Sequence, residues 1–199
     1  MFLGHILGVG KDDHSLWEKD EFQNPWVRLE NGYTRSIYQM SDGKLLGVSE
    51  CNNLQVKTDF TSAWEVVSDS GPVICAIQLQ DGRILGVTDK HELQWRETLT
   101  SEWIPEANSG HVICVSQLLN RTILGVNRNH ELCTKVTLGT PWFTIPNSGS
   151  VQSACVLRNG VILGVAGKNH QLYTRVELGM QWQQIPDSGD VIAVGWGEI

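Results

Sequence analysis

The chain has 199 residues, of which 41% are hydrophobic and 19% are charged. This composition excludes a disordered protein, because the chain can bury enough apolar surface to offset the conformational entropy lost on folding. Its 15 basic and 22 acidic residues give a formal net charge of −7, and a phosphate-backbone partner demands a basic face, so we expect no nucleic-acid binding. No apolar run approaches the roughly 18 residues of a membrane span, so we expect no membrane insertion.

The start of the chain and its cysteines suggest no targeting segment and no redox site. The first ten residues contain neither a basic segment nor a small-residue cleavage motif. We therefore expect a cytoplasmic or granule-stored protein, or a mature form that acts outside the cell, and the compartment stays open. The five cysteines are odd in number and none has a CxxC spacing, so we expect buried small hydrophobic residues, with no metal and no cofactor.

An internal repeat organises the whole chain. The tripeptide Leu-Gly-Val begins, always 39 residues apart, at Leu7, Leu46, Leu85, Leu124 and Leu163. A tryptophan follows each copy, at Trp26, Trp64, Trp103, Trp142 and Trp182. A turn glycine comes next, at Gly32, Gly71, Gly110, Gly149 and Gly189. Five copies of three landmarks predict one domain, residues 1–199, built from a repeated unit.

Each period contains four short strands, as the third complete copy shows. Residues 112–118 are apolar on both faces, which is typical of a central strand, and residues 122–127 and 132–136 follow after hairpin turns. Residues 142–146 form the last strand, and Pro146 lacks an amide donor, so this strand must lie at a sheet edge. No segment has helical periodicity, and the class is therefore all-β.

Four strands in a period of about 40 residues indicate a blade of a β-propeller. The chain starts at the second strand of a blade, His5–Gly10, and ends on an apolar strand, 191–196, that supplies the missing innermost strand. We expect a five-bladed ring whose first blade is shared between the two ends, which removes the open sheet edges of an unclosed array.

These features together resemble the tachylectin-type and tectonin-type five-bladed β-propeller lectins. The resemblance implies the propeller fold and sugar binding. The ligands that it implies are N-acetylated hexosamines on microbial or cell surfaces, and the role that it implies is in innate immunity. Those lectins carry Gly-Gly-Trp or similar motifs in the loop before the inner strand. Here that loop reads Asp69-Ser-Gly, Asn108-Ser-Gly, Asn147-Ser-Gly or Asp187-Ser-Gly.

Polar residues recur on the face where these Ser-Gly loops meet the turn between the second and third strands. The loops contribute Asp69, Ser70, Asn108, Ser109, Asn147, Ser148, Asp187 and Ser188. The turns contribute a histidine or its replacement, at His14, Asn52, His91, His130 and His170. Mixed donors and acceptors at the end of each interblade groove would suit sugar hydroxyls. The same residue types also cap tight turns, and this alternative stays open.

A second recurring position is basic in every copy: Lys19, Lys57, Arg96, Lys135 and Arg175. The residue two positions earlier on the same strand face is aromatic in two copies, Trp17 and Tyr173. A cation beside a ring is one way to hold a sugar, while an interblade ion pair or a stem packed on apolar surface explains the repeat equally well. The five repeated tryptophans have the same two interpretations, packing between blades or stacking on sugars.

An enzyme is not expected. A glycosidase needs two carboxylates at a defined separation, and in a propeller they would project from the inner strands into the axial funnel. The five inner strands contain neither Asp nor Glu. We therefore expect a multivalent glycan-binding protein with repeated equivalent sites. The alternative is a non-catalytic propeller that binds a protein partner on one face.

The number of competent sites and the oligomeric state stay open at this stage. Asn52 in the second copy and the shorter loop at Asn31-Gly32 in the first depart from the pattern, and these two sites are expected to be the weak ones.

Overall fold

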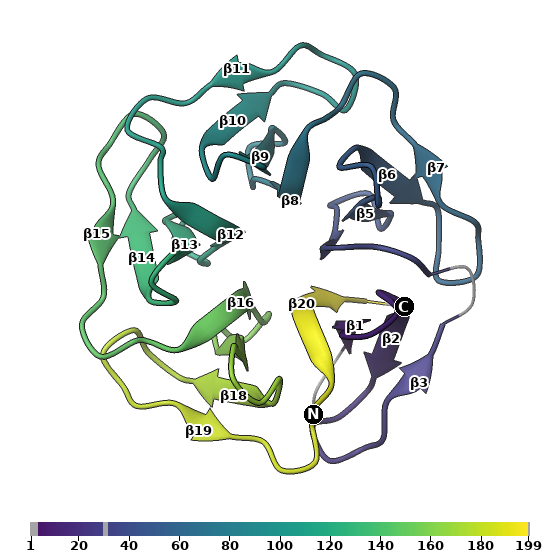
Figure 1. Cartoon of the computed structure of the whole chain (residues 1–199), viewed down its shortest axis with the longest axis vertical. Helices are drawn as coiled ribbons and strands as arrows, with labels where there is room; N and C mark the ends of the chain where they lie inside the picture. The colour runs from purple at the N-terminus through teal and green to yellow at the C-terminus, as the bar shows by residue number, and fades with distance from the viewer. Residues whose placement is uncertain (1–3, 30–31, 199) are drawn as a thin grey trace.

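The structure, a computed structural model, describes residues 4–29 and 32–198. In this part of the chain twenty strands form five separate four-stranded antiparallel sheets. Figure 1 shows the sheets arranged as blades around a central axis, so the predicted all-β five-bladed propeller is confirmed. The expectation about the loop at Asn31 concerns a residue outside the described part.

Blade A joins the two ends of the chain, as expected from the repeat. Its innermost strand is the C-terminal β20 (Val191–Gly197), which pairs antiparallel with β1 (His5–Gly10). Strands β2 (Leu16–Lys19) and β3 (Val27–Arg28) complete the sheet toward the rim. The first and last strands therefore hydrogen-bond to each other and close the ring (Figure 1).

Blades B to E each use four consecutive strands from the axis to the rim. Blade B contains β4 (Ile37–Gln39), β5 (Leu45–Val48), β6 (Leu54–Lys57) and β7 (Glu65–Val66). Blade C contains β8 (Val73–Gln78), β9 (Ile84–Thr88), β10 (Leu93–Arg96) and β11 (Ile104–Pro105). Blade D contains β12 (Val112–Gln117), β13 (Ile123–Asn127), β14 (Leu132–Lys135) and β15 (Phe143–Thr144). Blade E contains β16 (Val151–Val156), β17 (Ile162–Ala166), β18 (Leu172–Arg175) and β19 (Gln183–Gln184).

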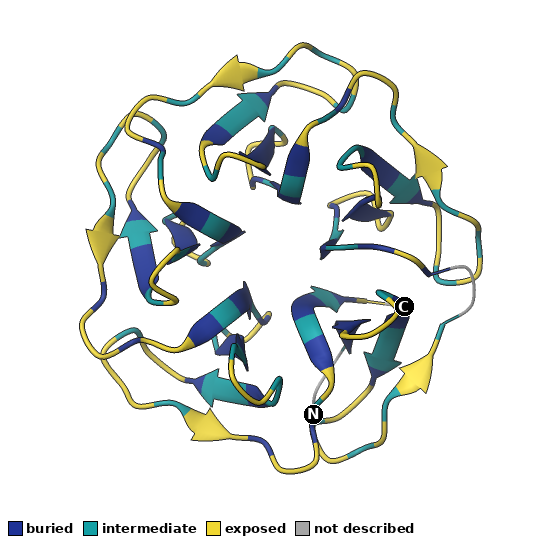
Figure 2. Cartoon of the chain, viewed as in Figure 1, coloured by how far each residue is buried: buried dark blue, intermediate teal, exposed yellow. Residues whose placement is uncertain are grey.

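The outer strands are the shortest and most exposed elements. Each has two residues, against the five predicted for 142–146, and both residues are exposed in every blade (Figure 2). The Ile145 N–H still donates to Leu132 O at 2.8 Å, and Pro146, the next residue, has no N–H with which to extend the pairing. The core instead lies between blades, where the inner and second strands bury the repeated leucines and valines.

The spacing between Leu-Gly-Val and tryptophan has a packing origin. The tryptophan ring that precedes each outer strand packs against the second-strand glycine of its own blade. A Cβ added at Gly125 would lie 2.9 Å from the Trp142 ring, and one at Gly164 would lie 2.8 Å from Trp182. Such contacts are closer than real Cβ atoms tolerate, so the glycine is needed wherever the ring packs.

Candidate functional site

The five repeated basic side chains are buried within the blades rather than presented to solvent. Lys19, Lys57, Arg96, Lys135 and Arg175 are 0–2% exposed. Each cation lies 4.7–5.8 Å from the centre of the tryptophan ring of its own blade. We call this repeated pairing the cation–tryptophan stack. Its partner is the outer-strand tryptophan, not the third-strand aromatic residue that the sequence pattern suggested.

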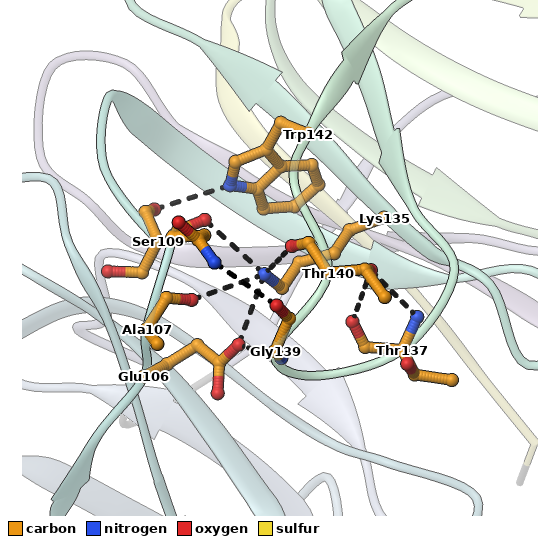
Figure 3. Close-up of polar contacts among 9 residues, drawn as sticks. Glu106, Ala107, Ser109, Lys135, Thr137, Gly139, Thr140 and Trp142 are labelled. Carbon is orange, nitrogen blue, oxygen red and sulfur yellow. Dashed lines mark hydrogen bonds and ion pairs between the residues drawn. The ribbon is translucent and has the colours of Figure 1, made fainter.

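Blade D shows what the cation does there. Lys135 Nζ donates to the carbonyl oxygen of Thr140 in its own blade (Figure 3). It also donates to Ala107 O at 3.4 Å and Asn108 O at 3.3 Å, and it lies 3.1 Å from Glu106 Oε1. These partners belong to the loop of its own blade and to the loop that leaves blade C. The lysine therefore joins two neighbouring blades through hydrogen bonds and an ion pair.

Burial of these cations has an electrostatic cost. Desolvation lowers the pKa of Lys19 and Lys57 below that of a free lysine, and it lowers the pKa of Arg96 and Arg175 in the same direction. The tryptophan faces and loop carbonyls offset that cost. Because the side chains are covered, this geometry supports the packing interpretation of the basic repeat.

The serines of the Ser-Gly loops also bond within the protein. Ser148 Oγ donates to Ile145 O at 2.6 Å and accepts from the Leu132 N–H at 2.8 Å, while its carbonyl accepts from Trp182 Nε1 of the next blade at 3.1 Å. The same three bonds occur around Ser188, with Trp26 as the next blade's donor. These loops therefore tie each blade to the next.

The recurring turn residues have a backbone reason for their identity. A positive φ, from 51° to 66°, is shared by His14, Asn52, Asp69, His91, Asn108, His130, Asn147, His170 and Asp187. This left-handed conformation favours Asn, Asp and His among residues other than glycine. The repetition of these residues therefore follows from the turns that they occupy.

The histidine side chains point to different partners. His130 Nδ1 lies 3.1 Å from Val151 O of the next blade, and His170 Nδ1 lies 3.1 Å from Gln152 Nε2 of its own blade. The His14 ring lies 5.3 Å from the Tyr33 ring. They do not form one repeated arrangement, and no group of three or more His, Cys, Asp or Glu in residues 4–29 and 32–198 is arranged to hold a metal ion.

Two pockets occupy equivalent positions in blades A and E. The pocket of blade A has a volume of about 410 Å³, and its walls include the Trp17 and Trp26 rings. The pocket of blade E has a volume of about 280 Å³, and its walls include the Tyr173 and Trp182 rings. In each, one ring comes from the third strand and the other from the cation–tryptophan stack. We call them pocket A and pocket E.

A longer turn distinguishes these two blades. Their second and third strands are joined by one more residue than in blades B, C and D. In blade A the Gly10 N–H donates to Ser15 O at 2.8 Å, five residues on. In blade C the corresponding bond runs from the Thr88 N–H to Glu92 O at 2.8 Å, four residues on. The extra residue moves the turn and changes what the histidine beside it contacts.

The second strand of these two blades also ends on a small residue, Gly10 or Ala166. Blades B, C and D have Ser49, Thr88 and Asn127 there, and each of these side chains accepts an N–H of its own turn. A Cβ on Gly10 would lie 2.9 Å from Trp17 Nε1.

The small residue and the third-strand ring are therefore matched partners. The larger ring, Trp17, lies over Gly10, and the smaller ring, Tyr173, goes with Ala166. None of the predicted histidines, serines or basic residues lines either pocket.

A third cavity, of about 150 Å³, lies on the axis. It is lined by inner-strand residues from all five blades, among them Ser36, Cys114 and Ser153, and no Asp or Glu is among them. Cys75 and Cys114 are buried there with their sulfurs 3.8 Å apart. This cavity offers small hydroxyls and thiols and no carboxylate pair.

The signal that sequence reasoning missed was present in the repeat. When the five copies are aligned, the same two copies have the added turn residue, a small residue before it and an aromatic residue after it. The small and aromatic residues are Gly10 and Trp17 in one copy, and Ala166 and Tyr173 in the other. In the sequence pattern the two aromatic residues stood out only as neighbours of the basic position.

Comparison with known proteins supports the fold. No protein-family model matches the chain, and no curated protein matches it. Among solved structures, a chain of a nidogen/laminin complex aligns with 96% of this chain and 80% of its own at a TM-score of 0.65 and 6% identity. A gluconolactonase from Xanthomonas campestris aligns with 96% of this chain and 79% of its own at a TM-score of 0.60 and 12% identity. At these identities the likeness shows the propeller fold alone.

In the residues that the structure describes, no helix is long and apolar enough to cross a membrane.

Proposed function

We propose that this protein is a non-catalytic carbohydrate-binding protein that holds glycans in pockets A and E. The observation that carries the proposal is the repeated construction of the two pockets, each with two aromatic walls and a polar turn at its rim. A sugar ring has an apolar face of C–H groups and a periphery of hydroxyls. Aromatic walls can pack against the C–H face, and mixed polar groups can hydrogen-bond to the hydroxyls.

The polar rim of pocket E illustrates the fit. Asn169 Nδ2 donates to the Tyr173 hydroxyl at 3.2 Å, and its Oδ1 accepts the Gln171 N–H at 3.2 Å, which leaves the second amide hydrogen and Ser150 near the ring. Donors and acceptors thus surround an aromatic surface at one mouth. N-acetylated hexosamines, the ligands that the family resemblance implied, combine such hydroxyls with an acetamide group.

The proposal includes more than one binding site per chain. Pockets A and E lie on adjacent blades of the ring, and a clustered surface glycan that engages both gains avidity beyond the affinity of either site. The absence of a carboxylate among the residues lining the axial cavity supports a binding role rather than glycoside hydrolysis.

A protein-binding propeller is the second candidate. Its support is the apolar residues on the rim, where Phe143 is 67% exposed and Val136 69% exposed on the same blade. A protein partner of this kind would occupy the rim of blade D and leave both pockets free.

The experiment is a glycan array, followed by calorimetry with the best monosaccharide to count sites. We expect two sites per chain. Trp17→Ala and Tyr173→Ala should each weaken one site by at least about five-fold, and the double variant should weaken both, since a stacked ring contributes on the order of 1 kcal/mol or more.

Gln94→Ala is the matched control, because Gln94 occupies the same third-strand position in blade C. Thermal unfolding should show that all variants are folded. A blank array with folded protein would overturn the proposal, and so would binding that is unchanged in the double variant.

A further inference from the structure

Pockets A and E share their architecture and differ in charge. The residues that line pocket A include three aspartates and one lysine: Lys11, Asp12, Asp13 and Asp190. The residues that line pocket E include Lys168 and no carboxylate. The two linings therefore carry formal charges of opposite sign.

The difference falls at equivalent positions. Along the longer turn, Asp12 of blade A corresponds to Lys168 of blade E, and Asp13 corresponds to Asn169. On the loop that enters the inner strand, Asp190 corresponds to Ser150. Three aspartates of blade A are thus replaced in blade E by a lysine, an amide and a hydroxyl at corresponding positions of the sequence.

Backbone hydrogen bonds hold these groups around each pocket. The Lys11 N–H donates to Asp190 O at 2.9 Å, which fixes the loop that carries Asp190 against the turn that carries Asp12. The equivalent bond in blade E runs from the Gly167 N–H to Ser150 O at 3.0 Å. The charges therefore belong to ordered turns at the pocket rim.

The charge of pocket A does not cancel internally. Asp13 accepts the Ser15 hydroxyl at 2.6 Å and the Ser15 N–H at 3.0 Å, and these bonds, aided by Arg28, lower the pKa of its carboxyl. Arg28 lies 3.0 Å from Asp13 and offsets its charge. Asp12 and Asp190 together outweigh Lys11, so the lining of pocket A carries a net negative charge.

We propose that the two pockets select sugars of opposite charge: pocket A binds hexosamines with a free ammonium group, and pocket E binds sugars with a carboxylate. The inference rests on the carbohydrate-binding function proposed above. In pocket A an ammonium would lie near the carboxylates of Asp12 and Asp190, which attract a cation. In pocket E the Lys168 ammonium would pair with a sugar carboxylate, while Tyr173 and Trp182 receive the ring.

The expected selectivity is moderate because the charged side chains are exposed. One ion pair at 4 Å in water contributes about 1 kcal/mol, which is roughly a five-fold change in affinity. Screening should reduce this preference at high salt, where the Debye length falls to about 3 Å.

The test separates the pockets with the variants already described. Tyr173→Ala retains pocket A, and Trp17→Ala retains pocket E. Each variant is applied to an array that carries hexosamines as free amines, the same hexosamines in N-acetylated form, and hexuronates. Binding is measured at low and at high salt and at about pH 6, where such amines are protonated. We expect Tyr173→Ala to prefer the free amines about five-fold and Trp17→Ala to prefer the hexuronates by a similar factor.

Charge variants then assign the preference. In the Tyr173→Ala background, Asp12→Asn with Asp190→Asn should abolish the preference for amines, and Asp190→Asn keeps a residue that tolerates its φ of 71°. In the Trp17→Ala background, Lys168→Gln should abolish the preference for uronates. Asp89→Asn, an exposed turn aspartate in blade C, is the matched control and should change neither profile.

Each outcome decides the question. Identical profiles for the two single-pocket variants would overturn charge selection and leave the carbohydrate-binding function standing. Preferences that persist in the charge variants or at high salt would also overturn it. A wild-type protein that binds no glycan would overturn both proposals.

Discussion

Blades A and C fold the same four strands around the same cation–tryptophan stack and differ at the end of the second strand. Blade C closes its turn over Thr88, whose hydroxyl accepts the Glu92 N–H. Blade A has Gly10 and one more residue in the turn, and a pocket bounded by Trp17 and Trp26 lies there. The difference teaches that in this ring the features shared by all five blades maintain the structure, while the features of only two blades form the pockets.

The largest expected effect concerns the shared part. Lys135→Met should destabilise the fold by about 3–5 kcal/mol, because it leaves the Glu106 carboxylate, 5% exposed, without its buried partner. Glycan binding per folded molecule should stay unchanged, since Lys135 lines neither pocket. Urea unfolding measures the change in stability, and calorimetry measures glycan binding.

The control for this variant comes from the other blades. Glu106 occupies the position held by Val67 in blade B, so Glu106→Val combined with Lys135→Met replaces both charges with apolar groups and should recover most of the stability. A loss equal to that of Lys135→Met alone would contradict the role given to the ion pair. Loss of glycan binding in a folded Lys135→Met protein would contradict the division between shared and pocket-forming features.

The next effect concerns the match between the small residue and the ring. Gly10→Ala places a Cβ 2.9 Å from both Trp17 Nε1 and Asp13 Oδ1 and should displace these side chains, with a loss of about ten-fold in affinity at pocket A, or about 1.4 kcal/mol. Calorimetry in the Tyr173→Ala background, which isolates pocket A, measures the change.

A compensating variant sharpens that test. Gly10→Ala with Trp17→Tyr gives blade A the pair found in blade E, Ala166 with Tyr173, and should recover most of the affinity. Gly110→Ala is the control, since nothing lies within 4 Å of a Cβ at that position, and it should be neutral. Equal losses in the single and compensated variants would exclude steric matching as the cause.

A smaller effect is expected from building the pocket into blade C. Thr88→Ala, Gln94→Tyr and insertion of one glycine after position 88 reproduce the three features of blade E. We expect a third site, about ten-fold weaker than the natural ones because its polar rim is not optimised. The same substitutions without the insertion should add no site, and a third site in that control would show that turn length is unimportant.

The smallest effect is a dependence of stability on alkaline pH. Burial lowers the pKa of Lys19 and Lys57 in the folded state, so between the lowered values and about 10.4 the unfolded chain binds more protons and the free energy of unfolding rises with pH. Each lysine should contribute on the order of 1 kcal/mol or less. Urea unfolding across this range should show that the free energy of unfolding rises less steeply with pH in Lys57→Met than in the wild type. The rise should be unchanged in Lys44→Met, which replaces an exposed lysine. Equal slopes in the wild type and both variants would refute the assignment.

Much of the architecture was accessible from the chain itself. The spacing of Leu-Gly-Val and tryptophan predicted five blades, and the structure explains it by rings such as Trp142 that pack on glycines such as Gly125. The shared blade at the two ends was also predicted, because the first segment lacked an inner strand and residues 191–196 had the apolar pattern to supply it. The shorter outer strands were not predicted, since pairing there ends where the edge has no further partner.

The candidate site was harder to predict because repetition has two causes. His91, His130 and the Ser-Gly residues recur at turns that need a left-handed backbone or a hydrogen bond to the next blade, and a sequence pattern does not separate that need from ligand binding. The basic repeat was ambiguous for the same reason until burial of Lys19 and Arg96 beneath tryptophan rings was visible.

The sequence by itself determined the class of fold, the number of blades and the closure of the ring, because strand alternation, hairpin turns and repeat spacing are local properties of the chain. Only the tertiary structure decided where the pockets lie and what charge they carry. Closure of the ring brings Asp190 from the last loop against Lys11 from the first turn, and contact between residues this far apart follows from packing rather than from any local pattern.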